Sequence, residues 1–345
     1  MAIQTVLGKV NKNELGIIMP HEHIFIDLTA FYTERVIPGC SNPGGEKVTI
    51  RNLGILSRDP YALRDDLVID DFNAQCDELI ELRNAGCSTI VDASSIGLGR
   101  DPRMLKSIAQ ATGLNVVMGS GYYVDATHSD ALREMTVEQI AGNILRDIRD
   151  GADGTNIKPG VIGEIGISED FTPSEKRVLR AAGIAQRETG LGILLHINPW
   201  TTFGLEAVDI LFSEGVAPDR IAVCHSDVEN RIDYMESLLQ KGVYVEFDNF
   251  GKEYYVAKSS RHKGYGTFVH DTDRVDLLAK LLSKGYEKQL LLSCDVCLKI
   301  LLHRYGGWGY DHVLTNIIPM LKEEGVLEST IEQMIRWNPA DFLER

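Results

Sequence analysis

Pro20-His21-Glu22-His23 closes an apolar run at residues 15–19 and opens another at residues 24–26. On an extended strand, two histidines one residue apart point to the same face of the sheet. Imidazoles inside an apolar sequence need polar partners. A shared metal ion satisfies His21 and His23 together, and a pair of hydrogen-bonded histidines is the alternative.

The chain has 345 residues, a length that suits one large α/β barrel or two ordinary domains. Its 44% hydrophobic and 25% charged residues are typical of a globular protein with a sizeable core. The formal net charge of −15 argues against nucleic acid or an anionic membrane as the main partner, because both select basic surfaces. A small-molecule substrate is expected, and an anionic one remains compatible with a locally basic pocket.

The six cysteines are sparse and do not suggest a disulfide framework. Cys294 and Cys297 have the spacing of a redox or zinc motif, but no second cysteine pair accompanies them. The first ten residues lack the apolar core of a signal peptide, and no run approaches the roughly 18 apolar residues that a membrane span needs. We therefore expect a cytoplasmic enzyme, and a homodimer as the default assembly.

Short apolar runs alternate with helical patterns along the whole chain. The predicted strands are residues 17–27, 89–93, 115–119, 161–167, 193–197, 221–225, 243–247 and 290–295. The predicted helices are residues 70–85, 102–111, 137–149, 173–188, 204–214, 232–240, 275–282, 310–323 and 328–336.

Eight apolar strands, each followed by a helix, predict an α/β fold of the (β/α)8 TIM-barrel type. We expect one domain over residues 1–345, with long loops at about 28–68 and 248–270. A doubly wound open sheet is the alternative, but the first turn lacks a glycine-rich phosphate-binding fingerprint.

Ionisable residues stand at the carboxyl ends of five predicted strands, where a TIM barrel carries its active site. The candidate metal ligands are His21, His23, Glu164, His196, His225 and Asp295. Six ligands exceed the needs of one tetrahedral zinc, so we expect two divalent metal ions bridged by Glu164. One ion would take His21, His23, Glu164 and Asp295, and the other Glu164, His196 and His225. Zinc suits these ligands best, with manganese, cobalt or iron as alternatives.

The chain resembles the phosphotriesterase family of the amidohydrolase superfamily, and within it the phosphotriesterase homology proteins. The resemblance spans the whole chain and is carried by residues 19–23, 163–166, 195–196, 224–227, 293–295 and 306–311. It implies a binuclear metal-dependent hydrolase on a TIM barrel, with the ligands named above. Glu164 stands where the phosphotriesterases proper use a carboxylated lysine, as in the homology-protein branch; Lys158 is an alternative bridge. Val228 and Asn249 stand where those enzymes have a proton-shuttle pair, which weakens the case for organophosphate hydrolysis.

We expect a hydroxide shared by the two metals to attack a carbonyl carbon. Asp295 is the predicted catalytic proton acceptor, because a ligand carboxylate can also reach the hydroxide. One metal would polarise the carbonyl and stabilise the oxyanion. Asp227 would orient the ligands, or else simply cap the strand end.

Residues just past the strand ends are candidates for the substrate pocket. The candidates are Tyr122, Tyr123, Trp200, Lys252, Tyr254 and Arg261, with Lys263, His303 and Trp308 in addition. Lys252, Arg261 and Lys263 form a basic cluster that could grip a phosphate, carboxylate or sulfonate. A solvated loop is the alternative interpretation of this cluster.

These observations favour a hydrolase of a lactone or carboxylic ester, with a small anionic lactone as one form of the substrate. The alternatives are a phosphotriester or phosphodiester hydrolase, and an amidase acting on an acylated small amine. A metal-bearing binding protein without turnover is a further alternative, but a pure binder has no need of two open metal positions.

Overall fold

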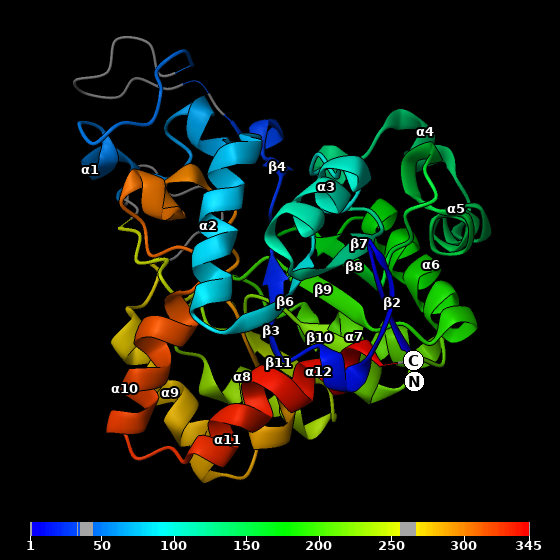
Figure 1. The fold of residues 1–345 in the computed structure, drawn as a ribbon. Coiled ribbons are helices and arrows are strands. Elements are labelled where there is room, and N and C mark those ends of the chain that lie inside the picture. Colours follow the sequence, from blue (N-terminus) through cyan, green and yellow to red (C-terminus); the bar gives the residue numbers. More distant parts are fainter. Residues whose placement is uncertain (1, 33, 35–43, 256–266, 345) are drawn as a thin grey trace.

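The computed structural model describes residues 2–32, 34, 44–255 and 267–344. Eight strands lie side by side in one sheet that wraps into a nearly closed barrel (Figure 1). From one edge to the other they are β3 (Ile17–Glu22), β6 (Cys87–Asp92), β7 (Asn115–Ser120), β8 (Val161–Ile167), β9 (Ile193–Ile197), β10 (Ile221–Val223), β11 (Tyr244–Phe247) and β12 (Leu290–Leu292). All seven ladders between neighbours are parallel, so the predicted (β/α)8 TIM barrel is confirmed.

Helices surround the sheet and bury its outer face. The longer ones are α2 (Phe72–Asn84), α3 (Pro102–Thr112), α5 (Val137–Asp150), α6 (Pro173–Thr189), α7 (Gly204–Ser213), α8 (Ile232–Gln240) and α9 (Asp271–Ser283). The shorter ones are α1 (Leu53–Leu56), α4 (Asp130–Glu134), α10 (Ile318–Glu323), α11 (Glu328–Glu332) and α12 (Asn338–Leu343).

Helix α6 begins and ends where its sequence signals predict. Thr172 accepts a hydrogen bond from the Glu175 backbone N–H and forms a capping box with it, and Pro173 occupies the first turn. The helix ends at Gly190, whose φ of 74° is a conformation that glycine adopts without a Cβ penalty.

Additional segments close the two ends of the barrel. The hairpin of β1 (Ala2–Thr5) and β2 (Gly8–Asn11) lies near the carboxyl terminus, so that both chain ends meet in Figure 1. At the other end, β4 (Ile26–Asp27) pairs with β5 (Val68–Ile69) and brackets the first long loop. The backbone N–H of Tyr255 donates to the Ser57 carbonyl at 2.9 Å, which joins the described parts of the two long loops. In the described part of the chain, no helix has the length and apolar character to cross a bilayer.

The alternation of side chains along each strand decides which residues face the barrel interior. Leu194 packs inside the barrel, and so His196, two residues later on β9, faces the same way. On β8 the register with β9 shifts between Ile162 and Ile165. This bulge turns Glu164 toward the interior, although simple alternation from the inward-facing Val161 would place residue 163 there. At Gly163, with φ of 126°, a Cβ would lie 2.5 Å from the Leu194 carbonyl oxygen, so the bulge requires glycine.

Three strands end at least two residues earlier than the sequence predicts. The first was expected to reach Asp27, but β3 ends at Glu22 and residues 26–27 form the separate strand β4. The sixth was expected to reach His225 and the eighth to reach Asp295, but β10 ends at Val223 and β12 at Leu292. His225 has φ of 56° and Asp295 has φ of 46°, and this left-handed backbone cannot continue a ladder. Both side chains therefore leave the sheet at its carboxyl edge and turn over the barrel mouth.

No backbone ladder joins β12 to β3 among the described residues; the Asp295 N–H donates to the His21 carbonyl at 3.2 Å, and side chains of Glu22 and Ser293 add to this seam. The Glu22 carboxylate accepts hydrogen bonds from the backbone N–H groups of Cys294 and Val296, both at 2.8 Å. Ser293 Oγ accepts from the His21 N–H at 3.1 Å, and its one proton has two alternative acceptors, the Glu22 carboxylate at 2.7 Å and the His21 carbonyl at 2.8 Å. The seam therefore holds the segments that carry His21 and Asp295 together.

We expect Glu22→Ala to lower the free energy of unfolding by roughly 2–6 kcal/mol, because it leaves two buried backbone N–H groups without an acceptor. The denaturant midpoint of the chelator-treated protein measures this, so that metal loss does not contribute. Glu188→Ala is the control, since its exposed pair with Arg149 contributes little. Equal midpoints for the two variants would show that Glu22 does not hold the seam.

Candidate functional site

All six predicted metal ligands meet at the carboxyl end of the barrel. Glu164 lies at their centre, because its Oε1 is 2.8 Å from His196 Nδ1 and 2.9 Å from His225 Nε2. The same oxygen is 3.6 Å from His21 Nε2. The other oxygen, Oε2, lies 3.8 Å from His23 Nε2. Glu164 thus directs Oε1 toward His196, His225 and His21 and Oε2 toward His23, a central position that a bridging ligand would need.

Asp295 completes the side of the cluster that holds the two strand-one histidines. Its Oδ1 is 3.1 Å from His23 Nε2 and 3.8 Å from His21 Nε2. Two groups of ligand atoms, His21 with His23 and Asp295, and His21 with Glu164 and His225, each lie within 4.8 Å of one another. These are separations that donors around one ion can span, since each bond to such an ion is about 2.0–2.2 Å.

His21 shows that this cluster fits a metal centre. Its ring is fully buried, and its Nε2 has no hydrogen-bond partner among the described residues. Nε2 points toward Glu164 and Asp295 over distances too long for hydrogen bonds. A buried imidazole nitrogen without a partner is costly, and a divalent cation shared with those carboxylates would satisfy it.

The buried negative charges of the site also favour the binding of cations. Four buried carboxylates, those of Glu164, Glu246, Asp248 and Asp295, lie around the histidines. Burial acts to raise the pKa of Asp295, but the Lys252 ammonium and nearby histidines outweigh it and hold the pKa below its usual range. Burial likewise opposes ionisation of Glu164, yet His196 and His225 bring its pKa well below the ordinary value.

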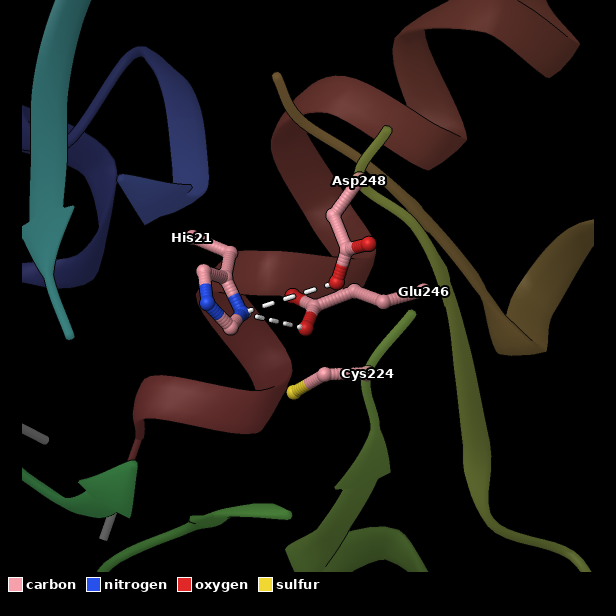
Figure 2. A group of neighbouring side chains, drawn as sticks. All are labelled: His21, Cys224, Glu246 and Asp248. Carbon is pink, nitrogen blue, oxygen red and sulfur yellow. Dashed lines mark hydrogen bonds and ion pairs between the residues drawn. The ribbon is translucent and has the colours of Figure 1, made fainter. Parts of the chain in front are cut away.

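Figure 2 shows a group behind His21 that the sequence analysis missed. His21 Nδ1 is 3.1 Å from Glu246 Oε2 and 3.6 Å from Asp248 Oδ2, and Cys224 lies beside them. Burial, followed by the charges of Glu246 and Asp248, raises the pKa of the Cys224 thiol well above its ordinary value, which favours the neutral thiol over a thiolate ligand. This group therefore supports His21 from behind through its Nδ1. The signal was available, because Glu246 is a carboxylate inside an apolar strand, as Glu164 is.

Asp227 does not contact the candidate metal ligands directly. It accepts hydrogen bonds from the Asn249 side chain at 2.8 Å and from the Asn249 backbone N–H at 3.1 Å. Arg274 Nε lies 3.2 Å from its other side. Asp227 thus anchors the segment that follows β11, and it can orient the candidate ligands only through the residues of that segment.

A cavity of about 120 Å³ opens beside the ligand cluster. Four predicted pocket residues line it, namely Tyr123, Trp200, Lys252 and Tyr254. Phe268, which the sequence analysis did not single out, stands edge-on to Trp200 and Tyr254 with ring centroids 5.4 and 5.1 Å apart. The Tyr254 hydroxyl is buried and has no hydrogen-bond partner among the described residues.

Three other expected pocket residues lie elsewhere. Tyr122 points the opposite way from Tyr123, as successive residues of an extended chain do, and its hydroxyl accepts from Asn143 at 3.1 Å. His303 pairs with Asp311 at 2.6 Å. Trp308 is half exposed and stacks on His312. Arg261 and Lys263 fall outside the described residues.

Lys252 is neither a solvated loop residue nor a free cation. It is 4% exposed, and its ammonium forms an ion pair with Asp295 Oδ2. It is the one lysine or arginine among the described residues that line the cavity. Any anion that it contacts would lie next to Asp295.

Val228 and Asn249 both line the cavity, as expected from their places in the sequence. Lys158 precedes β8, whereas Glu164 lies within this strand and contacts His196 and His225, which favours Glu164 as the candidate bridge. The five cysteines in the described ranges are all free, and Cys294 and Cys297 do not belong to a described ligand group.

Comparison with known proteins gives consistent matches over the full length. The sequence model described as the phosphotriesterase family matches residues 1–343. N-acetyltaurine hydrolases of Salmo salar and Homo sapiens are 36% and 32% identical, each alignment covering 99% of this chain and 97% of the relative.

Two solved structures are also similar. A resiniferatoxin-binding protein from Rhodobacter sphaeroides superposes with a TM-score of 0.95 at 30% identity, over 99% of this chain and 95% of the other. A phosphotriesterase homology protein from Escherichia coli, complexed with phosphate in its active site, gives a TM-score of 0.80 at 30% identity, over 96% and 99% of the two chains.

We expect two divalent ions per chain in protein purified without chelator and reloaded with zinc or manganese, and at most one in Glu164→Gln. The amide cannot supply a charged oxygen to each side of the cluster. Elemental analysis of the purified proteins measures the content, with Glu188→Gln as an exposed control. One ion or none in the parent protein, or two in Glu164→Gln, would contradict the bridging arrangement.

Proposed function

The chain belongs to the phosphotriesterase family, and we propose that this hydrolase is a metal-dependent amidase for N-acylated small amines that carry an anionic group. The family resemblance found in the sequence is thereby confirmed. The observation that carries the proposal is the small cavity that sets one buried cation, Lys252, beside the six-ligand cluster. The curated relatives support it, because N-acetyltaurine is an amide of acetic acid with a small aminosulfonate.

The sequence analysis placed a lactone or carboxylic ester first and an acylated amine among the alternatives. The relatives favour the amide, since they match over nearly the whole length of both chains. The same site chemistry acts on esters and amides alike, because both reactions begin with attack of an activated water on a polarised carbonyl. The relative kcat/KM values for amides, esters and lactones therefore decide between these substrates.

We propose two divalent ions as cofactors. His21, His23, Glu164 and Asp295 would hold one, and Glu164, His196 and His225 the other. Zinc fits these nitrogen and carboxylate ligands best, with manganese, cobalt or iron as alternatives. When bound, such ions lower the pKa of water and polarise the substrate carbonyl.

Asp295 is the proposed proton carrier. An amine is a poor leaving group unless its nitrogen receives a proton as the C–N bond breaks. The Asp295 carboxylate directs Oδ1 toward the ligand cluster and Oδ2 toward Lys252. The low pKa of Asp295 keeps this carboxylate ionised between turnovers. Asp295 would take the proton of the attacking water and return it to the leaving nitrogen.

The cavity walls support the proposal of a small, partly apolar substrate. Tyr123, Trp200 and Phe268 present ring surfaces that can pack against an acyl group or a short methylene chain. The Lys252 ammonium and the Tyr254 hydroxyl, which has no hydrogen-bond partner among the described residues, are donors in the same wall, suited to the oxygens of a sulfonate or carboxylate. The phosphate in the active site of the Escherichia coli relative supports anion recognition here.

We expect the zinc- or manganese-loaded protein to release amine from N-acetyltaurine with a kcat/KM at least tenfold above that for N-acetylethanolamine, its neutral analogue. The same assay should give lower values for a γ-lactone, a nitrophenyl ester and a phosphotriester. Amine release and pH-stat titration measure these rates. A higher kcat/KM for a lactone or an ester than for every amide would instead identify the protein as an ester hydrolase.

Lys252→Met should reduce kcat/KM for the anionic amide at least tenfold more than for the neutral one, because the variant keeps the side-chain volume and removes only the charge. Metal content is measured alongside, since Lys252 also contacts Asp295. Equal losses of kcat/KM for both substrates at unchanged metal content would show that Lys252 interacts with Asp295 and does not bind the anionic group of the substrate.

A further inference from the structure

We propose that Asp248 is a positioning residue shared by both halves of the metal centre, whereas Glu246 serves His21 alone. The inference rests on the metal centre of the proposed function and adds two residues that hold its ligands in place. Both carboxylates are fully buried, and both come from the end of β11, which, like β6 and β7, supplies none of the six candidate ligands.

Asp248 fixes the imidazole of His225. Its Oδ1 lies 3.0 Å from His225 Nδ1, while His225 Nε2 lies 2.9 Å from Glu164 Oε1. A carboxylate at that distance holds the proton of the neutral ring on Nδ1. The lone pair of Nε2 is then free and faces the cluster, as a metal ligand requires.

Asp248 also holds the backbone of His225. The His225 N–H donates to both carboxylate oxygens, at 3.1 Å to Oδ1 and 2.9 Å to Oδ2. His225 has φ of 56°, a left-handed conformation that is unfavourable for a residue with a Cβ and persists only where its surroundings impose it. One carboxylate thus fixes both the main chain and the ring of this ligand.

The second ligand that Asp248 faces is His21. Asp248 Oδ2 lies 3.6 Å from His21 Nδ1, and Glu246 Oε2 lies closer, at 3.1 Å (Figure 2). Glu246 accepts the His21 proton on Nδ1, and the negative charge of Asp248 favours the same proton position without a hydrogen bond. His21 Nε2, which has no hydrogen-bond partner among the described residues, then faces Glu164 and Asp295. Glu246 makes its contacts with His21, whereas Asp248 reaches His21 and His225 together.

Asp248 is itself held in place from behind. Asn249 Nδ2 donates to Asp248 Oδ1 at 2.7 Å, and the same amide group donates to Asp227. Arg274, which is fully buried, pairs with Asp227 at 3.2 Å. This chain of contacts explains why Asp227 is buried and charged without touching a ligand.

The test compares Asp248→Asn with Glu246→Gln, two isosteric changes on the same strand end. Stepwise binding of Co²⁺ is followed by its visible absorption in competition with a chelator, and zinc content is measured separately. Asp248→Asn should weaken both binding steps by at least tenfold, and Glu246→Gln should weaken only one. Weakening of a single step by Asp248→Asn, or no weakening, would overturn the inference.

A second measurement does not depend on the variants folding. In the ¹⁵N-labelled parent protein, the ring nitrogens of His21 and His225 report which nitrogen carries the proton. In the zinc-loaded protein we expect a protonated Nδ1 and an unprotonated Nε2 in both; a proton on Nε2 of His225 there would overturn the inference. A parent protein that binds no metal would defeat the proposed function, while a His225 Nδ1 that carries no proton in that protein would still overturn the role of Asp248.

Discussion

Buried negative charge is the constraint on which the structure of the barrel mouth depends. Glu164, Glu246, Asp248 and Asp295 lie together in surroundings of low dielectric constant, where like charges repel strongly. Lys252 offsets part of this charge, and the histidines can offset more only by taking up protons. The proposed divalent cations would resolve the conflict, because the histidines would then remain neutral and supply lone pairs instead of protons.

The barrel places the ligands by three local devices. Ordinary alternation along β9 turns His196 inward with Leu194. The bulge at Gly163 reverses the alternation of β8 so that Glu164 faces the centre. Left-handed residues at the ends of β10 and β12 carry the other side chains over the mouth. From the first of these arrangements to the third, the backbone departs further from regular strand geometry and depends more on contacts with neighbouring side chains.

The increasing departure from regular strand geometry explains how much of the molecule could be predicted from sequence. The strands and helices follow apolar periodicity, and their predicted bounds hold within a few residues, except where the first strand ends at Glu22 and where His225 and Asp295 leave the sheet. The candidate ligands, and Glu246 with them, could be found because ionisable residues stand out in apolar runs. The direction of Tyr122, the pairing of Lys252 with Asp295, and the contacts of Asp248 with two histidines were not predictable, because they depend on how segments distant in sequence meet.

The side-chain seam between β3 and β12 also has a consequence for how the chain folds. Glu22 and Ser293 are 271 residues apart, and the strands between them pair in sequence order around the barrel. Closing so long a loop is slow and costly in chain entropy. His21 and His23 lie on one side of this contact and Asp295 on the other, so a chain in which it has not formed cannot bring the full candidate ligand set together. Uptake of the proposed metal ions would therefore require the closed barrel.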